Sequence, residues 1–211
     1  MSKPTSTEAS CLKCGNKFQI AIWGSVRPHV YPLLREKVLD GTFFCHTCPE
    51  CGSSGIVEYS MIYHDLPRRF MLSLVLEGQN KPQTFSTELL EKTGLILNGY
   101  HLRIATSTEA LVEKIRIFEA GLDDRVTRPL KLIAIAYAVQ NSSVEGLVAQ
   151  ECKALFARYN DKQPEPVIEF NVFHQGTYFF TVTLPFELYQ GGEQNASKFG
   201  IRLNRGEWQI V

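Results

Sequence analysis

Two pairs of cysteines stand at a spacing that binds metal ions. The first pair is Cys11 and Cys14, the second pair is Cys48 and Cys51, and a glycine directly follows each pair. Two thiols separated by two residues hold a metal from two corners, and a second such turn completes a tetrahedral shell with zinc–sulfur distances of about 2.3 Å. Glycine suits these turns because it adopts a positive φ without strain. The sequence therefore predicts one Zn²⁺ site with four thiolate ligands.

Two other interpretations of these cysteines stay open, namely four buried thiols without a metal and two disulfide bonds. The chain has 6 cysteines in 211 residues, and most of them stand at metal-type spacing. That usage fits a reducing compartment better than a disulfide framework. Four thiolates fill a tetrahedral shell, so the predicted role of the zinc is structural rather than catalytic.

A fifth thiol and an imidazole, Cys45 and His46, stand just before the second pair. Cys45 and Cys48 also have the two-residue spacing, so spacing alone leaves the register ambiguous. We assign Cys48 with Cys51, because only that pair is followed by glycine. Cys45 is interpreted as a spare strand cysteine, with a redox-sensing thiol as the alternative. Cys152, in an expected helix, is interpreted as a small buried apolar residue.

His64 and Asp65 are the weak candidates for acid–base catalysis, because a carboxylate can orient an imidazole. Neighbouring side chains on a strand point to opposite faces, so pairing would require a bend. The favoured interpretation is a structural turn in which Asp65 accepts hydrogen bonds from backbone amides near Pro67. The sequence has no P-loop, G-x-S-x-G, H-E-x-x-H or dinucleotide motif. It therefore favours a protein without catalytic activity.

Charge and composition narrow the class further. The chain is 44% apolar, enough for one large domain or two small ones, and its 22 basic and 22 acidic residues balance. This balance argues against nucleic acid as a partner, since phosphate binding rests on positive charge. No apolar run approaches the roughly 18 residues that span a bilayer, and the first ten residues lack the apolar segment of a signal peptide. We expect a cytoplasmic protein with no membrane segment.

The residues around the cysteines indicate a small β-rich region with one helix. The expected elements are a disordered start over residues 2–10, strands over 17–23, 56–63 and 70–76, and a helix over 32–39. Proline at position 32 suits the first helical turn, and Gly41 suits the residue after the last turn. A turn around residues 65–68 joins the last two strands.

The rest of the chain changes from mixed to mainly helical and then to a hairpin. The expected elements are a break at Pro82, a helix capped at 86–88 and ending at Lys92, an Asn98-Gly99 hairpin, helices over 107–122, 123–139 and 144–159, and strands over 167–173 and 177–184. Pro129 must kink the second of these three helices or begin a new one. A charged cluster at the helix junction is interpreted as a solvated helix face or as inter-helix ion pairs. Its members are Glu113, Lys114, Asp123, Asp124 and Arg125.

The predicted fold is α+β: a zinc-ribbon-like antiparallel sheet with an inserted helix, then a helical segment and a C-terminal β-hairpin. The predicted regions are residues 1–80, which bind zinc and are β-rich, 81–163, which are mainly helical, and 164–211, which form the hairpin and a Gly-rich, poorly patterned tail. These regions can also form one compact unit.

The chain resembles the CpXC family. The residues that carry the resemblance are the four paired cysteines, Met61–Asp65, Leu111–Glu119 and Leu122–Arg125, within a stretch from about residue 9 to residue 130. The resemblance implies zinc binding by Cys11, Cys14, Cys48 and Cys51, and it implies no established biochemical activity. Residues 160–211 have no counterpart in it.

The leading hypothesis is a cytoplasmic adaptor or protein-interaction module in which zinc orders the N-terminal sheet and the folded surface recognises a partner protein. The first alternative is a hydrolase-like enzyme that uses His64 and Asp65 in a cleft between the zinc-binding sheet and the helices. A weaker alternative is a nucleic-acid-binding zinc ribbon. Its basic residues would be Lys13, Lys17, Arg27, Arg68 and Arg69.

Overall fold

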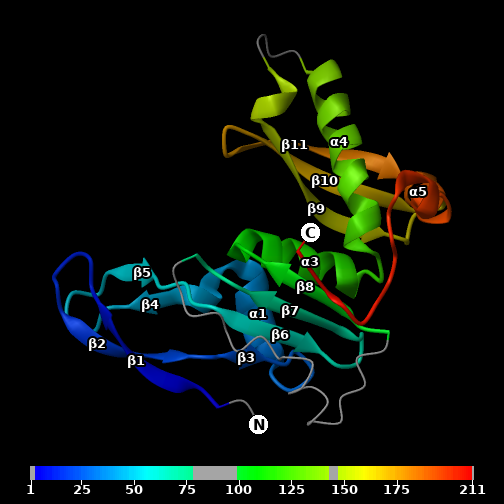
Figure 1. The fold of residues 1–211 in the computed structure, drawn as a ribbon. Helices are drawn as coiled ribbons and strands as arrows, with labels where there is room; N and C mark the ends of the chain where they lie inside the picture. The colour runs from blue at the N-terminus through cyan, green and yellow to red at the C-terminus, as the bar shows by residue number, and fades with distance from the viewer. Residues whose placement is uncertain (1–2, 78–98, 143–146, 211) are drawn as a thin grey trace. The chain divides into compact units, whose positions relative to one another are not determined.

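The computed structural model describes residues 3–77, 99–142 and 147–210 (Figure 1). The described chain contains helices and antiparallel sheets, including a C-terminal hairpin, which confirms the predicted α+β class. Two compact units make up the chain: residues 1–112 with 205–211 form the first, and residues 113–204 form the second. The boundary at 112/113 falls within helix α3 (Thr108–Glu119). The three predicted regions with boundaries near residues 80 and 163 stay a prediction.

Two short antiparallel hairpins carry the cysteine pairs in the first unit. In one hairpin, β1 (Thr5–Ser10) pairs with β2 (Lys17–Ile22), and in the other, β4 (Cys45–Thr47) pairs with β5 (Ser54–Ile56). The strand predicted to leave the first cysteine pair is confirmed as β2. The expectation of a disordered start was wrong for residues 5–10, because their backbone groups pair with β2 along the whole of β1.

A helix fills the interval between the cysteine pairs, as predicted. Helix α1 (Pro32–Asp40) has proline at its first position and ends at Gly41, whose φ of 81° is the left-handed conformation that glycine favours. A short 3-10 turn, η1 (Thr42–Phe44), then leads into β4 and buries both of its phenylalanines.

A five-stranded sheet forms the core of the first unit, in the order β12-β8-β7-β6-β3 (Figure 1). The predicted hairpin is confirmed as β6 (Met61–Asp65) and β7 (Phe70–Leu74), which pair antiparallel. The strand expected over 56–63 was too long at its start, because Ile56 ends β5 and residues 57–60 are not in a strand. The outer strands β3 (Ser25–Val26), β8 (His101–Ala105) and β12 (Trp208–Ile210) pair in parallel with their neighbours. The sheet is therefore mixed, since strands that arrive by long connections can pair in parallel. Every residue of β7 is buried, as expected of a central strand.

The hairpin predicted at Asn98-Gly99 falls partly outside the described residues. Three predicted features lie outside them: the break at Pro82, the helix capped at residues 86–88, and the first strand of that hairpin. Gly99 has a φ of 84°, and the residues after it form β8. β8 lies between two parallel neighbours, β7 and β12.

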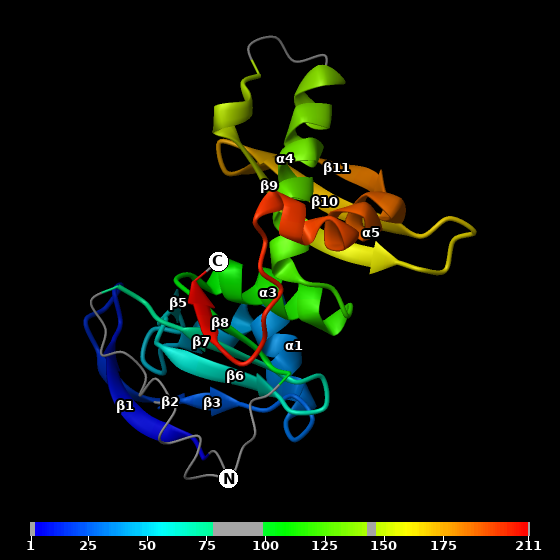
Figure 2. The same ribbon diagram turned by 45° about the vertical axis from the view of Figure 1, so that its right-hand side comes forward.

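The second unit packs helix α4 (Asp124–Gln140) on an antiparallel sheet in the order β11-β10-β9 (Figure 2). The predicted hairpin is confirmed as β10 (Val167–His174) and β11 (Thr177–Pro185). α4 runs through Pro129 as one helix and buries Leu130, Ala134 and Ala138. Within the described residues, no helix combines the length and the apolar composition that crossing a bilayer requires.

One prediction for the second unit was wrong. The later part of the helix expected over residues 144–159 is a strand, because residues 152–160 form β9 (Cys152–Asn160), which pairs with β10. Its buried Ala154 and Phe156 alternate with more exposed neighbours, the period of a strand, but the apolar residues before them also fit a helical spacing. The poorly patterned tail contains α5 (Phe186–Gln194), which buries Tyr189 and continues into η3 (Ala196–Phe199). A further short turn, η2 (Ala149–Glu151), precedes β9.

The charged cluster at the start of α4 forms ion pairs between helices. Lys114 of α3 pairs with Asp124 of α4 at 2.8 Å, and Glu113 pairs with Lys131 at 2.8 Å. Lys114 and Asp124 are only 6% and 4% exposed. The ion-pair interpretation is therefore confirmed, and the solvated-face interpretation was wrong.

Asp123 caps α4 and holds a buried arginine at the same time. Its carboxylate accepts a hydrogen bond from the Arg125 amide at 3.0 Å and contacts Nη2 of that side chain at 2.7 Å. Arg125 Nη1 also donates to the carbonyl oxygens of Arg202 and Asn204, at 2.6 and 2.9 Å. One carboxylate thus connects the helix start to the segment after η3.

We expect Asp123→Ala to lower the free energy of unfolding by about 3–5 kcal/mol, because it leaves the Arg125 charge buried without its carboxylate and removes the cap. Urea denaturation followed by circular dichroism measures this change. Glu187→Ala, on the exposed first turn of α5, is the matched control and should cost less than about 1 kcal/mol. A similar small change for Asp123→Ala would contradict the proposed importance of the pair.

Candidate metal centre

The structure brings the four sulfur atoms of Cys11, Cys14, Cys48 and Cys51 together, all within 4.8 Å of one another. Cys11 Sγ lies 3.6 Å from Cys51 Sγ, and Cys14 Sγ lies 3.7 Å from Cys48 Sγ. A tetrahedral ion with metal–sulfur distances near 2.3 Å requires sulfur–sulfur separations of about 3.8 Å. The arrangement therefore fits a single tetrahedral metal ion.

The two turns share one backbone pattern. The amides of Gly15 and Gly52 donate to the carbonyl oxygens of Cys11 and Cys48, at 2.9 and 3.0 Å. The amide of each of these cysteines donates in turn to the carbonyl of the residue after the glycine, at 2.9 Å in both turns. Both glycines have positive φ, 73° and 69°, with open space where a Cβ would stand. The backbone conformation, rather than lack of room, is what favours glycine here.

Each turn is the tip of a hairpin, and the two hairpins lie side by side in the first unit (Figure 1). β1 leads into the first turn and β2 leaves it, while β4 and β5 do the same for the second. Strand pairing therefore positions the two thiols of each pair.

The Ser53 hydroxyl is a further contact of the cluster that the sequence reasoning missed. Its oxygen lies 3.3 Å from Cys11 Sγ and 3.1 Å from Cys51 Sγ. A hydroxyl beside two thiolates stabilises their charge. Its position directly after the second glycine was the available signal, although the equivalent residue of the first turn is Asn16.

The thiols of the cluster differ in acidity. The Ser53 hydroxyl and backbone amides lower the pKa of Cys11 to about 6, and the same hydroxyl lowers the pKa of Cys51. For Cys14 the Asn16 amide acts to lower the pKa, but desolvation and the neighbouring thiols outweigh it and raise the pKa to about 12. Crowded thiolates repel one another, and a divalent cation relieves that repulsion.

The remaining thiols and the nearby imidazole lie outside this cluster. Cys45 is exposed on β4, and its Sγ donates to the Gly41 carbonyl at 3.6 Å. His46 is half-buried, and burial lowers its pKa. Cys152 is partly exposed on β9, a strand rather than the expected helix.

His64 and Asp65 do not form a hydrogen-bonded pair. Asp65 is buried and accepts hydrogen bonds from the Arg68 amide at 3.1 Å and from Arg68 Nη1 at 2.8 Å. His64 Nε2 instead lies 3.4 Å from the Tyr100 hydroxyl. This confirms the structural-turn interpretation of Asp65.

The surroundings of His64 make it a poor base at neutral pH. Burial lowers its pKa to about 4, and the positive charges of Arg27 and His29 act in the same direction. A general base works best with a pKa near the operating pH. The geometry and the acidity together weaken the case for a catalytic dyad.

The basic residues that the nucleic-acid-binding hypothesis relied on lie in two separate parts of the first unit. Lys13 and Lys17 belong to the β1–β2 hairpin, where Lys17 pairs with Glu8 at 3.0 Å. Arg27, Arg68 and Arg69 belong to loops at one end of the five-stranded sheet. They do not form one continuous basic surface around the thiols.

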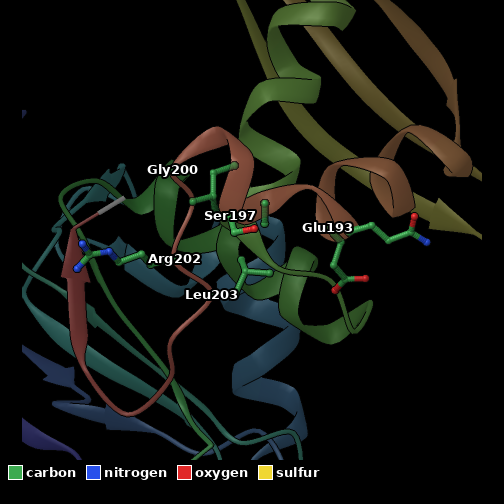
Figure 3. A pocket seen from close by; sticks show the side chains of 8 residues that line it. Glu193, Ser197, Gly200, Arg202 and Leu203 are labelled. Carbon is green, nitrogen blue, oxygen red and sulfur yellow. The ribbon is translucent and has the colours of Figure 1, made fainter.

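A pocket of about 640 Å³ lies in the second unit, between α5 and the segment after η3 (Figure 3). Its lining includes Glu193, Ser197, Gly200, Arg202 and Leu203. The charged side chains of Glu193 and Arg202 point away from each other, so these two charges do not converge on one ligand there. The thiol cluster remains the better functional site.

A comparison with protein families supports this choice. The family model described as CpXC protein matches residues 9–131, more than half of the chain and all four clustered cysteines. No curated protein and no solved structure matches the chain.

We expect Cys48→Ser to abolish metal binding and to lower the melting temperature, because it removes one of four ligands and metal binding contributes to folding. Elemental analysis and calorimetry of the purified protein test this. Cys45→Ser is the matched control and should retain one metal ion per chain and the wild-type melting temperature. Retention of the melting temperature after complete chelation would contradict a structural metal.

We expect His64 to make stability sensitive to acid. Its folded pKa of about 4 lies below the ordinary value of 6.5, so its contribution is complete above pH 6.5 and is lost as the pH falls towards 4. His64→Gln should therefore lose less stability than the wild type between about pH 7 and about pH 5. Urea denaturation at both pH values, with metal content measured in each sample, tests this, and equal losses would refute it.

Proposed function

The chain belongs to the CpXC family, and from that premise we propose that it is a zinc-binding adaptor that recognises a partner protein. The observation that carries the zinc proposal is the group of four sulfur atoms within 4.8 Å, supplied by two hairpin turns. Zinc accepts four thiolates in tetrahedral geometry, and such a shell leaves no position for a substrate. The proposed role of the ion is therefore structural. Because the thiols must stay reduced to bind it, we place the protein in the cytoplasm.

The hairpins that carry the thiols have little else to hold them together. Ala9 is the one fully buried residue of β1, and every residue of β5 is exposed. Two-stranded hairpins are marginal in water without a further core. Zinc would link the two turns and so order both hairpins, which makes its binding free energy a folding free energy.

An exposed apolar surface on α4 supports the proposal of a protein partner. Leu132, Ile133 and Tyr137 are 69%, 44% and 50% exposed, although the opposite side of the helix packs on the sheet. No charged side chain interrupts these residues along the helix, so the surface suits an uncharged, apolar partner surface. Ile133 and Tyr137 are one turn apart and lie next to each other, and Leu132 extends the same solvent-exposed side of the helix. We propose that an apolar helix of another protein covers this side.

The hydrolase alternative has no comparable support. Asp65 is engaged by Arg68, and His64 contacts Tyr100 rather than the carboxylate. A closed thiolate shell also offers no Lewis-acid site.

We expect Leu132→Glu to weaken binding of the partner by at least about tenfold, because it places a charge in an apolar contact. The partner is first captured from the native host and then purified, and calorimetry compares its affinity for wild type and variant. Glu187→Lys, exposed on α5 rather than on α4, is the control for a changed charge and should bind like the wild type.

If Leu132→Glu and the wild type bound the partner with equal affinity, the proposal that α4 forms the binding surface would be overturned. Self-association of the wild type in light scattering that Leu132→Glu abolishes would replace the proposed partner with a second copy. Purified protein that carries iron rather than zinc would overturn the choice of metal, since a four-thiolate site also suits iron.

A further inference from the structure

One end of the five-stranded sheet gathers basic side chains from three separate loops. β3 and β6 run in parallel and end there, while β7, β8 and β12, which run the opposite way, begin there. The sheet therefore collects the loop after β3, the β6–β7 turn and the segments before β8 and β12. The basic residues of these segments include Arg27, His29, Arg68, Arg69 and Arg205.

Two arginine side chains lie beside Gly99. Arg205 Nη1 donates to the Gly99 carbonyl at 3.4 Å, and Arg69 Nη1 lies 3.7 Å from the position of a Cβ on Gly99. Backbone hydrogen bonds hold both segments in place: Gly206 donates to Tyr100 and His101 donates to Arg69, each at 2.9 Å. The C-terminal segment thus runs back beside β8, as both ribbon views show (Figures 1 and 2).

Among the described residues of these segments, basic side chains outnumber carboxylates. Asp65 pairs with Arg68 at 2.8 Å, and Glu207 is the other carboxylate within that described part. In the described part of the chain, Arg27, Arg69 and Arg205 form no ion pair with a carboxylate. Like charges held together at a surface destabilise one another unless an anion joins them.

The backbone of Arg69 lies in the left-handed region. Its φ is 53°, and its amide closes the β6–β7 turn on the Leu66 carbonyl at 3.2 Å. Gln175 in the β10–β11 turn has a similar φ of 48°, so the hairpin turn accounts for this conformation. A glycine would adopt it at lower cost than arginine.

We propose that this end of the sheet binds the phosphoryl group of a phosphomonoester through Arg69 and Arg205, with Arg27 adding charge. A guanidinium presents paired N–H donors that match phosphate oxygens, and several arginines suit a dianion better than a carboxylate. Arg69 and Arg205 both lie beside one residue, Gly99, rather than along a track, and the chain has no net charge, so a single phosphoryl group fits better than a nucleic-acid backbone. This site is separate from the thiol cluster and extends beyond the proposed adaptor role.

The test is titration of the intact metal-loaded protein with inorganic phosphate, phosphoserine and acetate, followed by NMR and calorimetry. Arg69→Gly should weaken phosphate binding by at least about tenfold, because it removes a charge-assisted bidentate contact. The same variant should fold at least as stably as the wild type, since glycine adopts this φ freely. Arg205→Gln should weaken binding similarly, and Arg128→Gln, exposed on α4, is the matched control for loss of one charge.

The outcomes separate the possible ligands. Tighter binding of phosphoserine than of phosphate would support a phosphorylated protein segment, and equal binding would support a small phosphomonoester, both through the same phosphoryl contact. Acetate binding as tight as phosphate, or equal phosphate affinity of Arg69→Gly and the wild type, would overturn the proposal. Tighter binding of an unphosphorylated oligonucleotide with steep salt dependence would overturn it in favour of a nucleic-acid backbone.

Discussion

The convergence of four cysteine sulfurs within 4.8 Å is the contact on which the N-terminal part of the first unit depends. The hairpins that carry them bury few apolar side chains, so hydrophobic packing contributes little to holding one hairpin against the other. Four thiols brought together without a cation repel as soon as they ionise. The same geometry becomes favourable around a divalent ion, and we propose that such an ion holds together two hairpins with such small cores.

The second unit depends on buried ion pairs rather than on a thiol cluster. Lys114, Asp123, Asp124 and Arg125 are all less than 9% exposed, and each is paired. Removing one partner from such a pair lowers the free energy of unfolding by more than the intact pair contributes to it, because the other charge stays buried alone. The charged residues at the α3–α4 junction lie within the range that the family model matches, and their ion pairs join the two helices.

The proposed functions occupy different surfaces for a physical reason. In the proposed zinc site the four thiolates fill the coordination shell and leave no position for a substrate. The apolar surface of α4 and the arginines at the end of the central sheet instead leave apolar area and charge unmatched within the described residues. A partner protein can cover exposed apolar area of this kind, and an anionic ligand can neutralise such positive charge.

Local sequence patterns by themselves determined the features that depend on neighbouring residues. The paired cysteines with their glycines, the α1 end at Gly41, the Ser107 cap of α3 and the β10–β11 hairpin all follow from spacing, turn chemistry or capping within a few residues.

Only the tertiary structure decided what depends on distant pairing. Residues 152–160 carry apolar spacing compatible with either helix or strand, and pairing with β10 selects the strand. Ser53 reaches Cys11 only because the second turn lies against the first, and Arg205 meets Arg69 at Gly99 only because β12 pairs with β8. The sequence thus determined which four thiols could bind a metal, while long-range strand pairing decided which hydroxyl and which arginines lie beside one another.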